Sequence, residues 1–297
     1  MTVVLWASAF VAIRSADGHF APGALALGRL LVASLALGVI WLCSGAGWPA
    51  RAAWPGILGS GLLWFGLYMF ALNWGERDVD AGTAAMLVNI GPILVALLGG
   101  WLLHEGFPRR LAAGMAVSFG GVIVVGISES GGGHASVTGV LLCLAAAVCY
   151  AAGVVCQKPA LRHASAVQVT TFGCFVGTAA CLPFAGQFVS QLGSAPVSAT
   201  LNVVYLGLFP TTLGFTTWAY ALARTTAGRM GATIYVVPVL VIVMSWLILG
   251  QVPRWLAVVG GVLCLAGVAV SRSRSRRSRG GGRESNPPAL QRSAHQF

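Results

Sequence analysis

Glycines and prolines recur along this chain at a fixed offset of 146 residues. The matched pairs are Gly61 and Gly207, Pro92 and Pro238, Gly114 and Gly260, and Gly121 and Gly267. Around the proline pair, residues 82–95 read GTAAMLVNIGPILV and residues 228–241 read GRMGATIYVVPVLV. Residues that shape the backbone recur at a fixed offset when one structural unit is duplicated, so we expect two copies of one unit.

Each copy is mostly apolar. Hydrophobic residues make up 57% of the chain and charged residues 8%, whereas a soluble domain carries about 25% charged residues. Only helices satisfy their backbone groups in lipid as separate segments, which predicts an all-α integral membrane protein. Ten segments are expected as transmembrane helices, at residues 2–15, 24–43, 54–74, 81–103, 110–128, 138–157, 166–185, 199–222, 229–250 and 254–271.

Five spans in each copy place the second copy upside down in the membrane relative to the first. The sequence therefore predicts two inverted five-helix repeats, at residues 1–128 and 138–271, with a linker at 129–137 and a disordered basic tail at 272–297. The stretch Gly186–Pro196 is expected to be the longest loop. Inverted repeats are the architecture of secondary transporters.

Positive charge predicts the orientation. With the N-terminus inside, the inner loops carry seven basic residues before the tail, which are Arg51, Arg109, Arg110, Lys158, Arg162, Arg224 and Arg229. The outer side carries three, which are Arg14, Arg77 and Arg254. The positive-inside rule thus predicts a multi-pass protein of the cell membrane with both termini cytoplasmic.

The first segment is short, because 13 residues precede Arg14 and a helix needs about 20 residues to cross the hydrocarbon core. The segment also lacks the basic start and the cleavage site of a signal peptide. Either the Arg14 side chain extends outward to the membrane surface, or translation begins upstream of Met1, and we expect the upstream start.

The net charge of +11 does not indicate a nucleic-acid partner. Much of it lies in the C-terminal arginine run, and a basic tail beside a last helix is typical of contact with anionic membrane lipid. The seven cysteines fall in or beside apolar runs without a CxxC motif, and the histidines lie at segment ends, in loops or in the tail. We expect no metal site and no cofactor.

Several stretches carry a family resemblance. They are WASAFVAIR (Trp6 to Arg14), Pro22, Gly28–Arg29, and GERDVDAGTAAMLVNIGPILVALLGGWLLHEGFP (Gly75 to Pro108), of which Pro92 to Glu105 followed by Gly114 is the most specific part. Over about residues 1–272 the chain resembles the EamA-type transporters of the drug/metabolite transporter superfamily. The resemblance implies ten helices in two inverted repeats and transport of small metabolites, often outward, without ATP. Two departures are Gln251 in place of a second Glu105, and the lack of an arginine on the seventh segment to match Arg29.

Arg29 is the most informative candidate for substrate binding. It lies inside the second segment, where a charge costs ~2.5–3.5 kcal/mol on insertion scales. Its guanidinium is suited to grip a carboxylate or phosphate, and a structural pin to helix-end carbonyls is an equally good interpretation. Polar and aromatic side chains of other segments complete the predicted substrate contacts, namely Trp6, Tyr68, Asn73, Asn89, Tyr150, Trp218, Tyr220 and Tyr235.

Other residues are predicted to shape or gate the path. Pro92 and Pro238 lie mid-segment, where proline kinks a helix and frees carbonyls. Glu105 is expected to cap the fifth helix at its N-terminus, with a proton-coupling carboxylate as the alternative. The remaining members of this set are Arg14, Lys158 and Gln251.

We expect a secondary active transporter that moves small metabolites, such as amino acids or their derivatives, by alternating access, with export as the expected direction and proton coupling as an open possibility. A polytopic membrane enzyme acting on lipid or lipid-linked substrates is the alternative, and a non-transporting scaffold is a third class. No Walker motif is present in the sequence, which argues against a built-in ATPase.

Overall fold

The computed structural model describes residues 1–16, 18–78, 87–129, 136–237, 239–240, 243–244, 247 and 255–272, and most of these fold into helices. The N-terminal half contains α1 (Thr2–Ala16), α2 (Pro22–Cys43), η1 (Arg51–Ala53), α3 (Trp54–Ser60), η2 (Gly61–Tyr68), α4 (Met69–Asp78), α6 (Gly91–Leu102) and α7 (Arg109–Glu129). The C-terminal half contains α8 (Val137–Ala160), α9 (Ala166–Cys181), η3 (Leu182–Phe184), α10 (Ala185–Ser194), α11 (Val197–Leu206), η4 (Gly207–Gly214), α12 (Phe215–Leu222), α13 (Ala227–Thr233), η5 (Ile234–Val236) and α15 (Trp255–Arg272).

Five continuous helical stretches in the described part of the chain are long and apolar enough to cross a membrane. They are Pro22–Cys43, Arg51–Arg77, Val137–Ala160, Ala166–Ser194 and Val197–Leu222. Shorter apolar helices occupy Gly91–Leu102 and Val258–Ser271. The described helices agree with the predicted all-α membrane class, whereas the count of ten spans and their inversion stay predictions.

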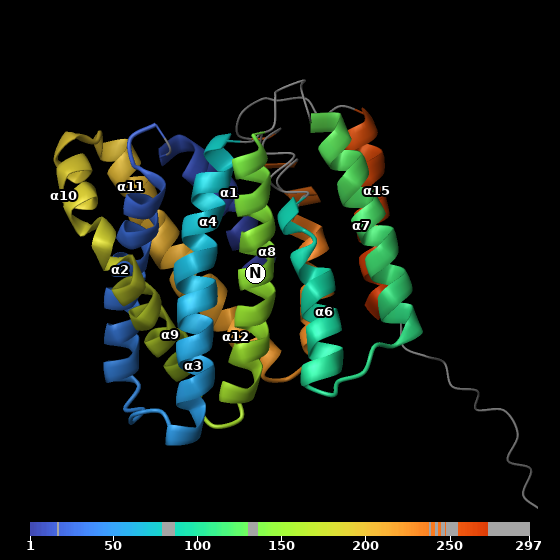
Figure 1. The fold of residues 1–297 in the computed structure, drawn as a ribbon, viewed down its shortest axis with the longest axis horizontal. Coiled ribbons are helices and arrows are strands. Elements are labelled where there is room, and N and C mark those ends of the chain that lie inside the picture. Colours follow the sequence, from blue (N-terminus) through green and yellow to red (C-terminus); the bar gives the residue numbers. More distant parts are fainter. Residues whose placement is uncertain are drawn as a thin grey trace, which may run out of the picture.

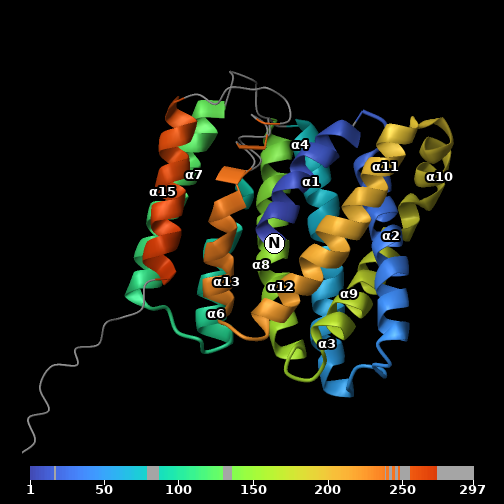
Figure 2. The same ribbon diagram turned by 180° about the vertical axis from the view of Figure 1, so that it is seen from behind.

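The helices stand roughly side by side as one bundle (Figure 1). The α7 and α15 helices lie together at one side, and α2, α10 and α11 lie at the other, as the view from behind also shows (Figure 2). The connections from α2 to α3, α6 to α7, α8 to α9 and α12 to α13 all lie at the bottom of both views. We call this the lower end of the bundle.

Two π-helical stretches, η2 and η4, occupy matching positions at the 146-residue offset. Each starts at a glycine against which another helix packs closely. A Cβ on Gly61 would lie 2.8 Å from the carbonyl oxygen of Gly173 on α9, and a Cβ on Gly207 would lie 2.8 Å from that of Arg29 on α2. The matched glycines therefore allow the same close packing in both halves.

Matched glycines also allow close packing between α7 and α15. A Cβ on Gly114 would lie 2.6 Å from the carbonyl oxygen of Gly267, and a Cβ on Gly121 would lie 2.6 Å from that of Gly260. Because Gly260 and Gly267 are the 146-residue matches of Gly114 and Gly121, each contact is the counterpart of the other. Small residues let membrane helices approach in this way.

The predicted loop at 186–196 is wrong, because α10 makes Ala185–Ser194 helical. No proline lies between Ala185 and Ser194, and tertiary contacts hold α10 against α2. The Phe188 ring fills the space beside Gly28, and Gln191 Oε1 accepts a hydrogen bond from Ala21 N at 2.8 Å. The flanking glycines and polar residues gave a turn-like composition to a segment that packs as a helix.

The third segment also extends beyond its predicted end at residue 74, because α4 continues to Asp78. Arg77 therefore lies on the helix, where its Nη2 donates to the carbonyl oxygen of Phe20 at 2.6 Å. Most of the predicted linker at 129–137 and the tail beyond Arg272 lie outside the described residues, so the predicted domain boundaries stay predictions.

Candidate functional site

A cavity of about 90 Å³ lies in the middle of the bundle. Residues from both halves line it, and they are Trp6, Ala9, Ile13, Arg29, Trp64, Tyr68, Met69, Leu72, Val88, Asn89, Pro92, Tyr150, Phe215, Ile234 and Val237. Five of the nine predicted substrate contacts are among them, namely Trp6, Arg29, Tyr68, Asn89 and Tyr150. The structure thus brings these five together, while their contact with substrate stays a prediction.

Aromatic rings form one wall of this cavity. The ring centroid of Trp64 lies 4.8 Å from that of Phe215, 5.5 Å from Tyr150 and 6.0 Å from Trp6. Trp218 packs behind Trp6, with centroids 5.1 Å apart, and it is fully buried without lining the cavity. Sequence reasoning missed Trp64 and Phe215, because hydropathy does not distinguish an interior aromatic side chain from one that faces lipid.

Arg29 reaches this cavity from α2 and is buried, with 6% of its surface exposed. Its Nε and Nη2 both donate to Thr211 Oγ1, at 3.3 and 3.1 Å. Thr211 in turn donates to the carbonyl oxygen of Leu206, at 2.7 Å, across the widened turn of η4. This threonine was not predicted, and its signal in the sequence is a polar residue inside the eighth apolar segment.

The fourth predicted segment is broken beside the cavity. A turn occupies Asn89 and Ile90, and α6 begins at Gly91. Pro92 therefore lies in the first turn of a helix rather than at a mid-helix kink as predicted, a position that suits proline because it has no N–H to leave unpaired. Tyr235 is buried behind the break, and its hydroxyl donates to the carbonyl oxygen of Asn89 at 3.3 Å.

Like Trp218, three more of the predicted substrate contacts do not line the cavity, and they are Asn73, Tyr220 and Tyr235. Asn73 is buried, and its Nδ2 donates to the carbonyl oxygen of Pro22 at 3.2 Å. Tyr220 is 56% exposed and holds the Arg224 guanidinium 3.5 Å from its ring centroid, so it lies outside the cavity. Tyr235 contacts the lining residue Asn89 without lining the cavity itself.

Some members of the predicted gating set cannot be placed. Pro238 and Gln251 lie outside the described residues, and so does the side chain of Arg14.

A second hollow, of about 440 Å³, opens at the lower end of the bundle. It is lined by Glu105, Lys158, Leu161, Arg162, Ala223, Arg224, Thr225, Thr226 and Arg229. Its basic residues come from the end of α8, from the α8–α9 and α12–α13 connections, and from α13. With four cations and one carboxylate, this hollow is positively charged.

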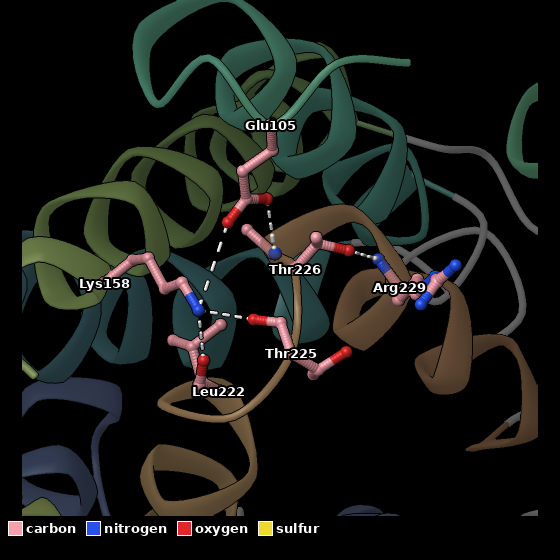
Figure 3. A network of polar contacts seen from close by, with 7 residues as sticks. Glu105, Lys158, Leu222, Thr225, Thr226 and Arg229 are labelled. Atoms are coloured by element: carbon pink, nitrogen blue, oxygen red, sulfur yellow. Dashed lines mark hydrogen bonds and ion pairs between the residues drawn. The ribbon is translucent and has the colours of Figure 1, made fainter. Parts of the chain in front are cut away.

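The polar contacts in this hollow connect three parts of the chain (Figure 3). Glu105 Oε2 accepts a hydrogen bond from Ala227 N at 2.7 Å, and its Oε1 lies 3.9 Å from Lys158 Nζ. Lys158 Nζ also donates to the carbonyl oxygens of Leu222, at 2.5 Å, and of Thr225. We call these contacts the Glu105–Lys158 network. It joins the α6–α7 connection, α8 and the α12–α13 connection.

The predicted role of Glu105 as the cap of the fifth helix needs correction. The residue lies in the α6–α7 connection, where His104 and Gly106 adopt positive φ angles of 53° and 73°. This backbone turns the Glu105 side chain to the first residue of α13 rather than to the start of α7. The carboxylate still meets a helix N-terminus, where the helix dipole favours a negative charge, but the helix belongs to the other half of the chain.

Comparison with known proteins gives a consistent result. The model of the EamA-like transporter family matches residues 1–127 and 137–273. A probable terminal-alkyne amino-acid exporter of Streptantibioticus cattleyicolor is 39% identical over 290 residues, covering 97% of this chain and 95% of the relative. The uncharacterized transporter YdfC of Bacillus subtilis is 34% identical, over 90% of this chain and 87% of the relative.

More distant relatives agree. A probable amino-acid metabolite efflux pump of Salmonella typhimurium is 26% identical, over 91% of this chain and 92% of the relative. A solved crystal structure superposes with a TM-score of 0.76 at 22% identity, covering 91% of this chain and 95% of that one, which indicates the same fold. These matches point to a transporter rather than an enzyme, and the chain belongs to the EamA-like transporter family.

Proposed function

We propose that this protein is a secondary active transporter that exports small amino-acid-type metabolites across the cell membrane by alternating access. The central cavity carries the proposal, because residues of both halves of the chain line it and it combines an aromatic wall with one buried cation. Such a concave, mostly apolar site with a few polar groups is typical of small-molecule binding. The names of the relatives support amino-acid-type substrates and the outward direction.

The proposed architecture is ten transmembrane helices in two inverted five-helix repeats, residues 1–128 and 138–271. The matching π-helices and the reciprocal glycine contacts between α7 and α15 support a duplication with two-fold related contacts. In inverted-repeat transporters the substrate site lies where the repeats meet, beside discontinuous helices. The broken segment at Asn89 and Ile90 fits this pattern.

The proposed orientation places the lower end in the cytoplasm, together with both termini. Lys158, Arg162, Arg224 and Arg229 gather there, as the positive-inside rule requires of a cytoplasmic end. The Glu105–Lys158 network then holds the cytoplasmic side together, and it must rearrange when the cavity opens to the inside.

The test is exchange of labelled amino acids by purified protein in proteoliposomes. We expect wild-type protein to accelerate the exchange of at least one member of a broad amino-acid panel that includes terminal-alkyne amino acids. Leu72→Trp, which fills the cavity, should lower the rate about tenfold or more, because it removes the space that the substrate needs. Its matched control is Leu67→Trp, since Leu67 is 45% exposed and lies outside the cavity.

The proposal would be overturned if folded wild-type protein exchanged no member of the panel. Formation of a modified lipid under the same conditions would favour the membrane-enzyme alternative instead.

A further inference from the structure

We propose that Arg29, held by Thr211, forms a subsite for a single carboxylate in the central cavity, so that the substrate is a small monocarboxylate with a short apolar remainder. This inference rests on the proposed transport function and adds the chemical class of the substrate and its orientation.

The Arg29 guanidinium has more N–H donors than its protein partner accepts. An arginine side chain carries five N–H donors, and Thr211 Oγ1 receives two of them, from Nε and Nη2. Among the described residues, no other hydrogen-bond acceptor contacts this side chain. The remaining N–H donors are free to bind a ligand oxygen in the cavity that Arg29 lines. A carboxylate in the cavity would satisfy these donors with charge-assisted hydrogen bonds.

The charge balance of the cavity favours an anion. Arg29 is the one ionised side chain among the described residues that line it, and the other lining residues are apolar, aromatic or neutral. Glu76 on α4 attracts Arg29 electrostatically, and it does not line the cavity. The N-terminal turn of α6, at Pro92, lines the same cavity and adds the positive end of a helix dipole.

The two halves of the chain differ at this position. Gly207 packs against Arg29 and Val32 of α2, as Gly61 packs against Gly173 and Val176 of α9. By these contacts Gly173 is the counterpart of Arg29, although it lies two residues before the position that the 146-residue offset gives, which is Phe175. Arg29 lines the cavity as a cation, whereas Gly173 has no side chain and is not among the lining residues, so the cavity offers one strong anion contact. A second carboxylate would enter an apolar site without a charged partner, at a large desolvation cost.

The lining residues other than Arg29 indicate what the ligand carries besides its carboxylate. Trp6, Trp64 and Phe215 provide an apolar wall, and the Tyr150 hydroxyl is buried without a hydrogen-bond partner among the described residues. Because no carboxylate lines the described cavity, an amino group of the substrate would meet only neutral acceptors. We therefore expect the carboxylate to contribute more to affinity than the amine.

Three probes separate these contributions. L-propargylglycine carries carboxylate, amine and a terminal alkyne, its methyl ester lacks the carboxylate charge, and 4-pentynoic acid lacks the amine. Binding to purified protein in nanodiscs is followed by tryptophan fluorescence, since Trp6 and Trp64 line the cavity. We expect the amino acid to bind wild-type protein about tenfold or more tightly than the ester, and 4-pentynoic acid to bind within about fivefold of the amino acid.

Substitutions identify the residue responsible. Arg29→Gln, which keeps a donor for Thr211, should bring the ratio of acid affinity to ester affinity down close to one, and Thr211→Val should lower this ratio in part. Arg162→Gln is the matched control, because it removes a cation from the lower hollow and should leave the ratio unchanged. If Arg29→Gln does not yield monodisperse protein, Thr211→Val and the wild-type comparison of acid with ester still give the test.

Equal weakening of acid and ester by Arg29→Gln would make Arg29 a structural pin and overturn the subsite. The absence of any acid preference in wild-type protein would also overturn it, even if proteoliposomes still exchanged amino acids, in which case the transport function would stand. Conversely, an acid preference that depends on Arg29, without exchange in proteoliposomes, would support the subsite and count against the transport function.

Discussion

The α7–α15 pair and the central cavity are both formed by residues of the two matched halves of the chain. They differ in whether equivalent positions of the two halves make equivalent contacts. In the pair, equivalent residues make equivalent contacts. Gly114 meets Gly267 as Gly121 meets Gly260, and Ser118 Oγ donates to the carbonyl oxygen of Cys264, the residue 146 positions further on. At the cavity this likeness is lost, because Arg29 lines it, whereas Gly173, which takes the matching place against Gly61, has no side chain and does not line it.

This difference distinguishes a region that only packs helices together from a region that recognises a ligand. A two-fold contact between helices needs only small residues that fit each other, so duplication can keep both copies alike. A small asymmetric ligand presents different groups on each side, so a site that recognises it must lose the symmetry. The side chains in which the two halves differ, within the described cavity, are therefore the ones to test for substrate selection.

The largest expected effect is a loss of stability when the α7–α15 contact is disturbed. Gly121→Val should destabilise the protein by about 1–3 kcal/mol, because the new side chain meets the backbone of Gly260 and forces α7 and α15 apart. Thermal unfolding in detergent, together with the monodisperse fraction on gel filtration, measures this loss. Gly120→Val is the control, since a Cβ at Gly120 meets nothing within 4 Å. Equal behaviour of the two variants would contradict the close packing.

A smaller effect is expected at the lower end. Glu105→Gln removes the ion pair with Lys158 and the negative charge at the start of α13. The arrangement with the Glu105–Lys158 network formed should lose about 1–2 kcal/mol relative to one in which the network is broken, which corresponds to roughly a tenfold shift between the two. A reporter cysteine at Leu161, in a cysteine-free background, should react about tenfold faster with a polar thiol reagent. Arg162→Gln, which lines the same hollow, should change this rate less than twofold, and a similar rise in both variants would refute the specific role of Glu105.

The smallest effect is expected outside the cavity. Tyr220→Ala should change exchange in proteoliposomes less than twofold, because Tyr220 is 56% exposed and contacts Arg224 rather than the cavity. A tenfold loss would mean that the substrate path runs along the outer face of α12 instead of through the centre.

The sequence predicted the helical class well, because apolar length and scarce charge determine which segments enter lipid. It also identified the glycines at which helices pack closely, since only a missing side chain permits such contacts. Burial of Arg29 followed from its place within an apolar segment. These features depend on local composition or on a single residue type.

Other features depend on how helices turn toward one another. Thr211, Trp64 and Phe215 line or support the cavity because of the rotation of η2, η4 and α12, which periodicity in an apolar segment does not reveal. Glu105 binds α13 rather than α7 because of the backbone turn around it. The α10 helix was missed because a few tertiary contacts outweigh its turn-like composition.

The central claim is that the cavity becomes accessible from each side of the membrane in turn. A single cysteine at Val88, which is half-buried and lines the cavity, in a cysteine-free protein reconstituted with known orientation, tests it most directly. A membrane-impermeant thiol reagent should label this residue when added from either side, and L-propargylglycine at saturating concentration should slow the labelling from both. Labelling from one side only, at an unchanged rate with substrate while exchange proceeds, would contradict the account.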